Sequence, residues 1–308
     1  MSIQHRLLLG MLLAPALHAQ IPVNALWKEP KIRNFLPHMT SPEVRALLSR
    51  TDIVIIPVPA LEQHADHLPI GTDYFAGVEQ AKLIAQRTDA LVAPILLAGQ
   101  SPYHMEFAGT ISLPSPLLQQ VYFEAAKSLI RHGFRRLLFL NSHVGNQYLT
   151  RAVVDRINQE TVGTALELRD AVATMEPPPA PAGSQGQEFD RHAGVGETAL
   201  GLYLFPSLVK LEEARIPTLT LPPHLAAMLP LVAAGDRAAT LIFLAEGLKP
   251  SKTGKGTSAR QMSSTGAWSV RDPHLATSLL GEQRVTQFVD AAVRFIERWR
   301  QLTPRARP

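Results

Sequence analysis

The chain has 308 residues, of which 46% are hydrophobic and 18% are charged, an ordinary composition for a globular protein with a sizeable core. It carries a formal net charge of +4 but no dense run of lysine or arginine, so we expect no nucleic-acid partner. It contains no cysteine, which excludes disulfides, thiolate metal sites and cysteine nucleophiles, and leaves His, Asp and Glu as metal ligands.

Residues 1–19 have the pattern of a secretory signal peptide. His5 and Arg6 precede a short apolar run that ends at Leu13, and small residues follow at a plausible cleavage point. The run is too short to span a bilayer, and no later segment is long and apolar enough, so we expect no stable membrane insertion. The alternative is a buried first helix. The pattern favours an exported protein, periplasmic or secreted, whose remaining residues 20–308 form a single domain.

Strand-like and helix-like segments alternate through the rest of the chain. The run Ile53–Val58 is apolar and rich in β-branched residues, which is typical of a strand buried on both faces. Ser115 with the proline after it marks the start of a helix, and Gly133 marks its end. This alternation predicts an α/β layer structure with a largely parallel sheet. The other strands are predicted over residues 91–97, 136–140 and 164–168, and the other helices over 74–87, 146–159, 194–204, 226–248 (one or two helices) and 281–302.

Two segments are predicted to be loops. Residues 176–186, with the sequence EPPPAPAGSQG, contain too much proline and glycine for regular structure. They lead into His192, so they form either a lid over a site or a plain surface loop, and both interpretations stay open. Residues 252–266 are rich in Gly, Ser, Thr and Lys and are also predicted to be a loop.

Candidate metal ligands follow two of the predicted strands. Glu62, His64 and Asp73 come after the first strand, and His143 comes after the third. Because ligands bind outside the carboxyl ends of the strands in an open parallel sheet, we expect these side chains to converge. Taken singly, a histidine such as His143 after a strand is more often a hydrogen-bonded structural residue than a ligand, and Asp73 alone could be only a helix cap. Together they favour a site for zinc, manganese or iron(II), in which a shared carboxylate bridges two ions that activate a water.

Five segments resemble signatures of the creatininase family, in the same order along the chain. The resemblance extends from about Ile53 to Gly281. It implies a three-layer α/β/α fold with a mostly parallel sheet and assembly into a homo-oligomer, often a hexamer. The segments are EQHADHLPIGTD (62–73), SPYHMEFAGTISL (101–113), NSHVGN (141–146), HAGVGET (192–198) and RDPHLATSLLGE (271–282).

The same resemblance implies an activity, a cofactor and a set of ligands. The activity is hydrolysis of a carbon–nitrogen bond other than a peptide bond, in a linear or cyclic small-molecule amide. The family also includes formamide deformylases and peptide-trimming enzymes, so the shape of the amide stays open. Two divalent ions (Zn, Mn or Fe) would be bound per chain. Glu62, Asp73 and His143 would bind one ion, and His64, Asp73 and Glu197 would bind the other, with Asp73 bridging them.

The remaining roles that the resemblance implies concern catalysis and substrate. His192 would be the general acid/base that transfers a proton to the leaving nitrogen. Ser101, His104 and the backbone around Gly145 would contact the substrate. The alternative from another class is a non-catalytic, metal-retaining periplasmic binding protein of the same fold. His192 argues against this alternative, because retention of metal alone would not need it.

The chain departs from the family pattern at several positions. Creatinine-hydrolysing members carry a glutamate where this chain has Gly145 and an aromatic residue where it has Val144. Creatinine itself is therefore not the expected substrate. Ala65 and Ser142 replace glycines of the first and third signatures, and Arg271 replaces a glycine of the fifth. None of these changes removes a predicted metal ligand.

Overall fold

A computed structural model describes residues 21–175, 189–234, 236–247 and 259–303. Its centre is a four-stranded, all-parallel sheet in the order β2-β1-β3-β4. Every residue of β1 is buried, as its β-branched sequence predicts. This confirms the predicted α/β fold. The strands are β1 (Ile53–Val58), β2 (Leu91–Val92), β3 (Arg136–Asn141) and β4 (Thr164–Glu167).

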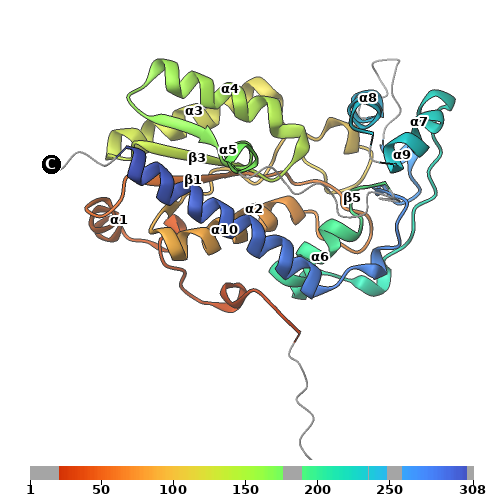
Figure 1. The fold of residues 1–308 in the computed structure, drawn as a ribbon, viewed down its shortest axis with the longest axis horizontal. Coiled ribbons are helices and arrows are strands. Elements are labelled where there is room, and N and C mark those ends of the chain that lie inside the picture. The colour runs from red at the N-terminus through yellow and green to blue at the C-terminus, as the bar shows by residue number, and fades with distance from the viewer. Residues whose placement is uncertain (1–20, 176–188, 235, 248–258, 304–308) are drawn as a thin grey trace, which may run out of the picture.

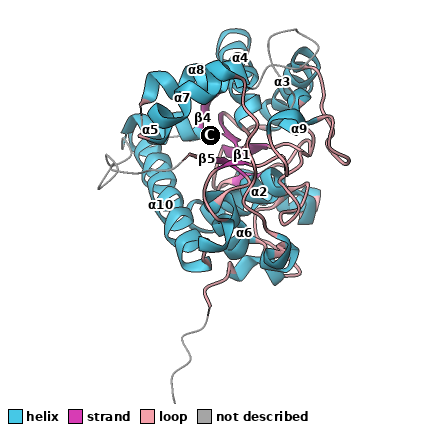
Figure 2. Ribbon diagram, turned by 90° about the vertical axis from the view of Figure 1, so that its right-hand side faces the viewer, coloured by secondary structure: helices cyan, strands magenta, loops and turns pink. Residues whose placement is uncertain are grey.

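The sheet is the middle of three layers. Helices α3 (Ser115–His132) and α4 (Gln147–Glu160) cover one face, and α2 (Thr72–Thr88) and α10 (Ser278–Leu302) cover the other (Figure 1). Successive side chains of β1 point to opposite faces, so Ile53 and Ile55 join the core under α2 and α10 while Val54 and Ile56 join the core under α3 and α4. A view turned by 90° shows the strands enclosed by helices (Figure 2). The predicted three-layer α/β/α architecture is confirmed.

Element boundaries differ from the sequence-based prediction where local chemistry intervenes. The predicted strand 91–97 pairs only over Leu91–Val92, because Pro94 has no N–H to continue the ladder. Helix α3 ends where predicted, at Gly133, which has a left-handed φ of 118°. Helix α10 begins three residues before the predicted start, because the side chain of Thr277 accepts a hydrogen bond from the N–H of Leu280.

A smaller group of elements, at the end of the molecule away from α1 (Ser41–Leu48), carries the HAGVGET segment (Figure 1). The helical segment predicted over 226–248 consists of two helices. The loop prediction for 252–266 is wrong at residues 259–262, which form α9. Ala259 and Met262 of α9 are buried, and Met262 packs with Phe189 and Trp268. The group consists of the antiparallel pair β5 (Asp190–His192) and β6 (Trp268–Ser269), with α6 (Val195–Leu204), α7 (Pro223–Ala233), α8 (Arg237–Gly247) and α9 (Ala259–Met262).

Three sequence-based expectations concern residues outside the described ranges. The signal peptide over 1–19, the lid or loop over 176–186 and the loop residues 252–258 therefore stay predictions. Within the described ranges, no helix combines the length and the hydropathy needed to cross a bilayer.

A buried ion pair joins β3 to the residue before β1. Arg136 and Asp52 are 7% and 6% exposed, and Nε of Arg136 donates to Oδ1 of Asp52 over 2.9 Å. The backbone carbonyl of Asp52 also accepts from the N–H groups of Arg135 and Arg136. The pair therefore ties together the starts of the two central strands, whose carboxyl ends lead to the site described below.

We predict that Asp52→Ala lowers the free energy of unfolding by about 3–5 kcal/mol, because it leaves the Arg136 charge buried without a partner. Urea titration followed by circular dichroism measures this. The control is Asp170→Ala, which removes an ion pair with Arg151 whose side chains are 44% and 47% exposed. That change should cost less than about 1 kcal/mol. Equal losses in the two variants would contradict the prediction.

Candidate metal centre

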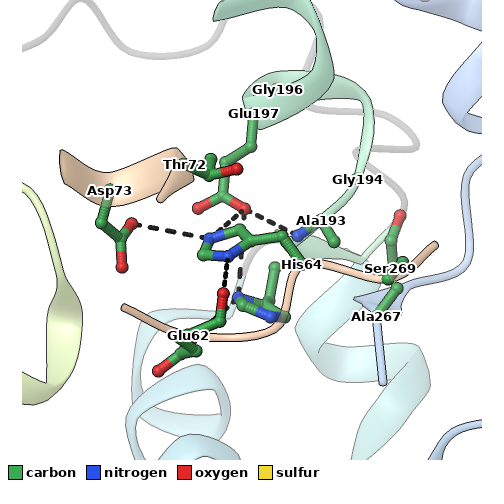
Figure 3. Close-up of polar contacts among 12 residues, drawn as sticks. Glu62, His64, Thr72, Asp73, Ala193, Gly194, Gly196, Glu197, Ala267 and Ser269 are labelled. Atoms are coloured by element: carbon green, nitrogen blue, oxygen red, sulfur yellow. Dashed lines mark hydrogen bonds and ion pairs between the residues drawn. The ribbon is translucent and has the colours of Figure 1, made fainter. Parts of the chain in front are cut away.

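The candidate ligands come from four separate segments that meet at the carboxyl edge of the sheet. Glu62 and His64 lie in the segment after β1, and His143 follows β3. Asp73 and Glu197 lie in the first turns of α2 and α6. Helix N-termini favour carboxylates, because unpaired N–H groups and the helix dipole give them a partial positive charge. Figure 3 shows the carboxylates of Asp73 and Glu197 directed at the same nitrogen of the His64 ring.

The distances among these groups define three overlapping clusters of three residues each. Within each cluster, the potential ligand atoms lie within 4.8 Å of one another. Nε2 of His64 is 3.5 Å from Oδ1 of Asp73 and 3.6 Å from Oε2 of Glu197. Nδ1 of His143 is 3.1 Å from the other oxygen of Asp73. Asp73 thus presents one oxygen to each of two clusters. The clusters are Glu62, Asp73 and His143; His64, Asp73 and Glu197; and Glu62, His64 and His192.

Several of these buried polar atoms lack a hydrogen bond. Within the described part of the chain, Oε2 of Glu62, Nε2 of His64 and Oδ2 of Asp73 are buried and make none. Native proteins leave few such atoms, because each costs free energy when water is excluded. All three are oxygen or nitrogen atoms that bind divalent metals, and they belong to the same clusters. The residues therefore fit a bound cation, which would satisfy them together.

Backbone carbonyls determine which nitrogen of each imidazole is free. Nδ1 of His64 is 2.9 Å from the carbonyl oxygen of Glu62. Nε2 of His143 is 3.1 Å from the carbonyl oxygen of Gln100. Because a carbonyl only accepts, each of these nitrogens carries the proton, and the opposite nitrogen is left with its lone pair. Nε2 of His64 and Nδ1 of His143 are thus both free to bind a metal beside Asp73.

His192 is oriented in the same manner. Its Nε2 donates to the carbonyl oxygen of Gln63 over 2.8 Å. The free Nδ1 lies 3.4 Å from Oε1 of Glu62 and 4.0 Å from Oε2 of Glu197. Desolvation and the neighbouring His64 hold the pKa of His192 well below its ordinary value. His192 is therefore neutral, with a free nitrogen that faces the carboxylates and can accept a proton or bind a metal.

Electrostatics around the clusters reflect an accumulation of carboxylates. Desolvation raises the pKa of Glu62, and it raises the pKa of Glu197 to about 7 against the attraction of His64. Desolvation alone would lower the pKa of His64, but the carboxylates of Asp73 and Glu197 raise it to about 10. A divalent ion that binds Nε2 would therefore displace a proton from it. Three carboxyl groups so close together repel one another when ionised. Bound divalent cations would remove this repulsion, which supports the fit to metal.

The residues predicted to contact substrate lie against the candidate ligands. Oγ of Ser101 is 3.2 Å from Nε2 of His143, and Nε2 of His104 is 3.5 Å from Oε1 of Glu62. Ser101 and His104 are 0% and 1% exposed. A Cβ atom at Gly145 would lie 2.4 Å from Nε2 of His143, so no larger residue fits there without movement. Their role in substrate binding stays a prediction, and their observed contacts are with the ligand set.

Sequence reasoning missed Gln63 and Tyr103. The hydroxyl of Tyr103 lies 3.4 Å from Nε2 of His143. In an extended segment Gln63 would point away from its neighbours Glu62 and His64. In the structure the backbone turns at Ala65, which has a left-handed φ of 55°, and the side chain of Gln63 contacts the ring of His192. The only signal in the sequence was the position of Gln63 inside the first signature.

A family model described as "Creatinine amidohydrolase" (Creatininase) matches residues 37–296. The chain belongs to the creatininase family of amidohydrolases. It is 31% identical over 264 residues to the mycofactocin precursor peptide peptidase of Mycobacterium tuberculosis, covering 82% of this chain and 88% of that one. It is 30% identical over 207 residues to the creatinine amidohydrolase of Pseudomonas putida, covering 62% and 79%.

Solved creatininase structures share the fold. A crystal structure of creatinine amidohydrolase superposes with a TM-score of 0.62 at 23% identity, covering 89% of this chain and 99% of that one. A creatininase variant of the "Zn-Zn type" covers 88% of this chain and 99% of its own at 23% identity, with a TM-score of 0.60. One described as "Creatininase Mn" covers 89% and 100% at 23% identity, with a TM-score of 0.61. These proteins are thus metal-bound, and this creatininase-family chain has carboxylate and imidazole groups arranged to bind metal.

We predict that Ala65→Gly raises the free energy of unfolding by up to about 1 kcal/mol. The left-handed conformation costs alanine about 1–2 kcal/mol, and the greater freedom of glycine in the unfolded chain offsets part of the gain. Chemical denaturation measures the change. The control is Ala125→Gly inside α3, which should lower stability by about 1 kcal/mol. Losses of the same size in both variants would show that Ala65 is not strained.

Proposed function

We propose that this protein hydrolyses an amide carbon–nitrogen bond with a water activated by two divalent metal ions, zinc, manganese or iron. The observation that carries the proposal is the position of Asp73, whose two oxygens belong to two different clusters of ligand atoms. A carboxylate in that position can bridge two ions. The unsatisfied buried atoms around it and the crowding of three carboxyl groups support the same proposal.

The ligands would divide between the ions as their clusters do. Glu62, Asp73 and His143 would hold one ion, and His64, Asp73 and Glu197 would hold the other. When bound, such ions polarise the scissile carbonyl and lower the pKa of a bound water to near neutrality. The backbone carbonyls behind His64 and His143 keep the correct nitrogen free.

His192 would move the proton. Its free Nδ1 faces the carboxylates, and its burial keeps the ring neutral at the start of the reaction. Nδ1 takes a proton from the attacking water and then transfers it to the departing nitrogen, so that the ring returns to its neutral state. Nε2 stays hydrogen-bonded to the carbonyl of Gln63 throughout, which holds the ring in place.

The substrate is an amide other than creatinine. The glutamate and the aromatic residue that creatinine-hydrolysing members carry are absent, and a side chain at Gly145 would collide with His143. One relative that matches most of the chain is named a peptide peptidase. A cavity of about 240 Å³ beside His143, lined in part by Arg169 and Gln147, offers room for part of a substrate. A substrate screen should therefore include small linear and cyclic amides and also short peptides.

Export and self-association complete the proposal. The pattern of residues 1–19 supports an exported protein, periplasmic or secreted. Leu241 and Ile242 of α8 are 70% and 53% exposed, and these apolar side chains are available for contacts between subunits. We propose that the protein forms a homo-oligomer, with a hexamer as the expected state. Light scattering after size-exclusion chromatography measures the mass, and a monomer at micromolar concentration would contradict this part of the proposal.

We predict that the purified protein binds about two divalent ions per chain and that Asp73→Ala loses most of both. The bridging carboxylate contributes to both ions, so its removal affects both. Elemental analysis after dialysis measures the metal content. The control is Asp66→Ala, an exposed aspartate in the same segment, which should keep the metal. A protein that is isolated without metal and takes up neither zinc nor manganese would overturn the two-metal proposal.

We predict that His192→Asn keeps the metal and lowers turnover of the amide found in the screen by about 10²–10⁴-fold, the usual contribution of a general acid/base. The control is His274→Asn, an exposed histidine paired with Asp272, which should leave turnover unchanged. Loss of metal from His192→Asn would assign His192 as a ligand instead. A metal-loaded wild-type protein that binds amides but hydrolyses none would favour the non-catalytic binding protein.

A further inference from the structure

The side chain of Gln63 is buried between two loops and has a defined orientation. It is 3% exposed. Its Oε1 accepts a hydrogen bond from the N–H of Ala65 over 2.9 Å, and its Nε2 donates to the carbonyl oxygen of Gly266 over 2.9 Å. A backbone N–H can only donate and a carbonyl can only accept, so these two contacts determine which end of the amide is oxygen and which is nitrogen.

The second proton of the Gln63 amide is directed at His104. Nε2 of Gln63 lies 2.6 Å from Nδ1 of His104. Because the amide nitrogen can only donate, Nδ1 of His104 is the acceptor and the ring proton is on Nε2. That Nε2–H faces Oε1 of Glu62 over 3.5 Å. Gln63 thus makes His104 present a donor to a candidate metal ligand.

The backbone of Gln63 has the opposite effect on His192. The carbonyl oxygen of Gln63 accepts from Nε2 of His192, so Nδ1 of His192 is free and lies 3.4 Å from the same Oε1 of Glu62. The two rings are neighbours, with centroids 4.6 Å apart. Through its two contacts, Gln63 therefore makes His104 present an N–H to Oε1 of Glu62. It makes His192 present an unprotonated nitrogen to the same oxygen.

The backbone of Gly266 packs directly against the Gln63 amide. It has a left-handed φ of 83°, and a Cβ atom there would lie 2.4 Å from Oε1 of Gln63. Gly266 is two residues before β6, which pairs with the strand that carries His192. The hydrogen bond from Gln63 to Gly266 thus also ties the segment after β1 to the strand pair β5–β6.

We propose that Gln63 is a positioning residue that sets the proton positions of His104 and His192, and through them orients Glu62 for the reaction. The catalytic consequence rests on the proposed amidohydrolase function. The proton positions themselves rest only on the contacts above, so they can be tested without a substrate.

The test measures the tautomer of His104 in the zinc-loaded protein. Long-range proton–nitrogen correlation spectra of ¹⁵N-labelled histidine distinguish protonated from free ring nitrogens, and the signals of His104 are those missing from His104→Asn. We expect a proton on Nε2 in the unaltered protein. In Gln63→Glu a carboxylate replaces the donor, so the proton should move to Nδ1. The matched control is Gln80→Met, another buried glutamine, and it should leave the His104 signals unchanged.

Gln63→Met extends the test, because it removes the donor without adding charge. We expect it to lose the single tautomer of His104 while keeping zinc. On the amide substrate, kcat should fall about 10- to 100-fold, the usual effect of losing a residue that orients metal ligands, with KM nearly unchanged. A His104 proton that stays on Nε2 in both Gln63 variants overturns the proposal. A zinc-loaded protein without turnover would overturn the proposed function, and the spectra would still decide the role of Gln63.

Discussion

The repulsion among three carboxyl groups around His64 is the constraint that the rest of the site depends on. Glu62, Asp73 and Glu197 arrive from three separate segments, and burial makes their ionisation costly. Imidazoles held by backbone carbonyls offset part of this cost, but several buried atoms remain without a hydrogen bond. A fold that concentrates carboxylates at this edge therefore fits bound cations there, and the metal-bound solved relatives have the same fold.

The parallel sheet makes this concentration possible. Because parallel strands end at the same edge of a sheet, the residues that follow β1 and β3 lie close together. About 80 positions separate them in the chain. The buried pair of Arg136 and Asp52 ties the opposite ends of the same strands. The parallel sheet thus positions most of the candidate ligands, while His192 comes from the separate strand pair β5–β6.

Hydrogen bonds to the imidazole rings determine which ring nitrogens face the carboxylates. The carbonyl oxygens of Glu62, Gln63 and Gln100 each hold one proton of an imidazole, so that the free nitrogens face the carboxylates. The Gln63 side-chain amide instead donates to Nδ1 of His104, so in that ring the nitrogen that faces Glu62 carries the proton. Proton positions in this site are therefore a property of the backbone path as much as of the side chains. The close approach of Gly145 to His143 shows the same dependence, because a side chain at position 145 would collide with this candidate ligand.

The sequence alone determined strands β1, β3 and β4, the end of α3 and which residues are candidate ligands. Hydrophobic runs, capping residues and ligand types are local properties, which is why Ile53–Val58 and Gly133 were predicted within a residue or two. Only the tertiary structure decided that His192 and Gln63 share contacts around Glu62, and that Ser101 and His104 lie against ligands. Those contacts join segments 40 to 200 positions apart in the chain. Local patterns carry no information on such long-range packing.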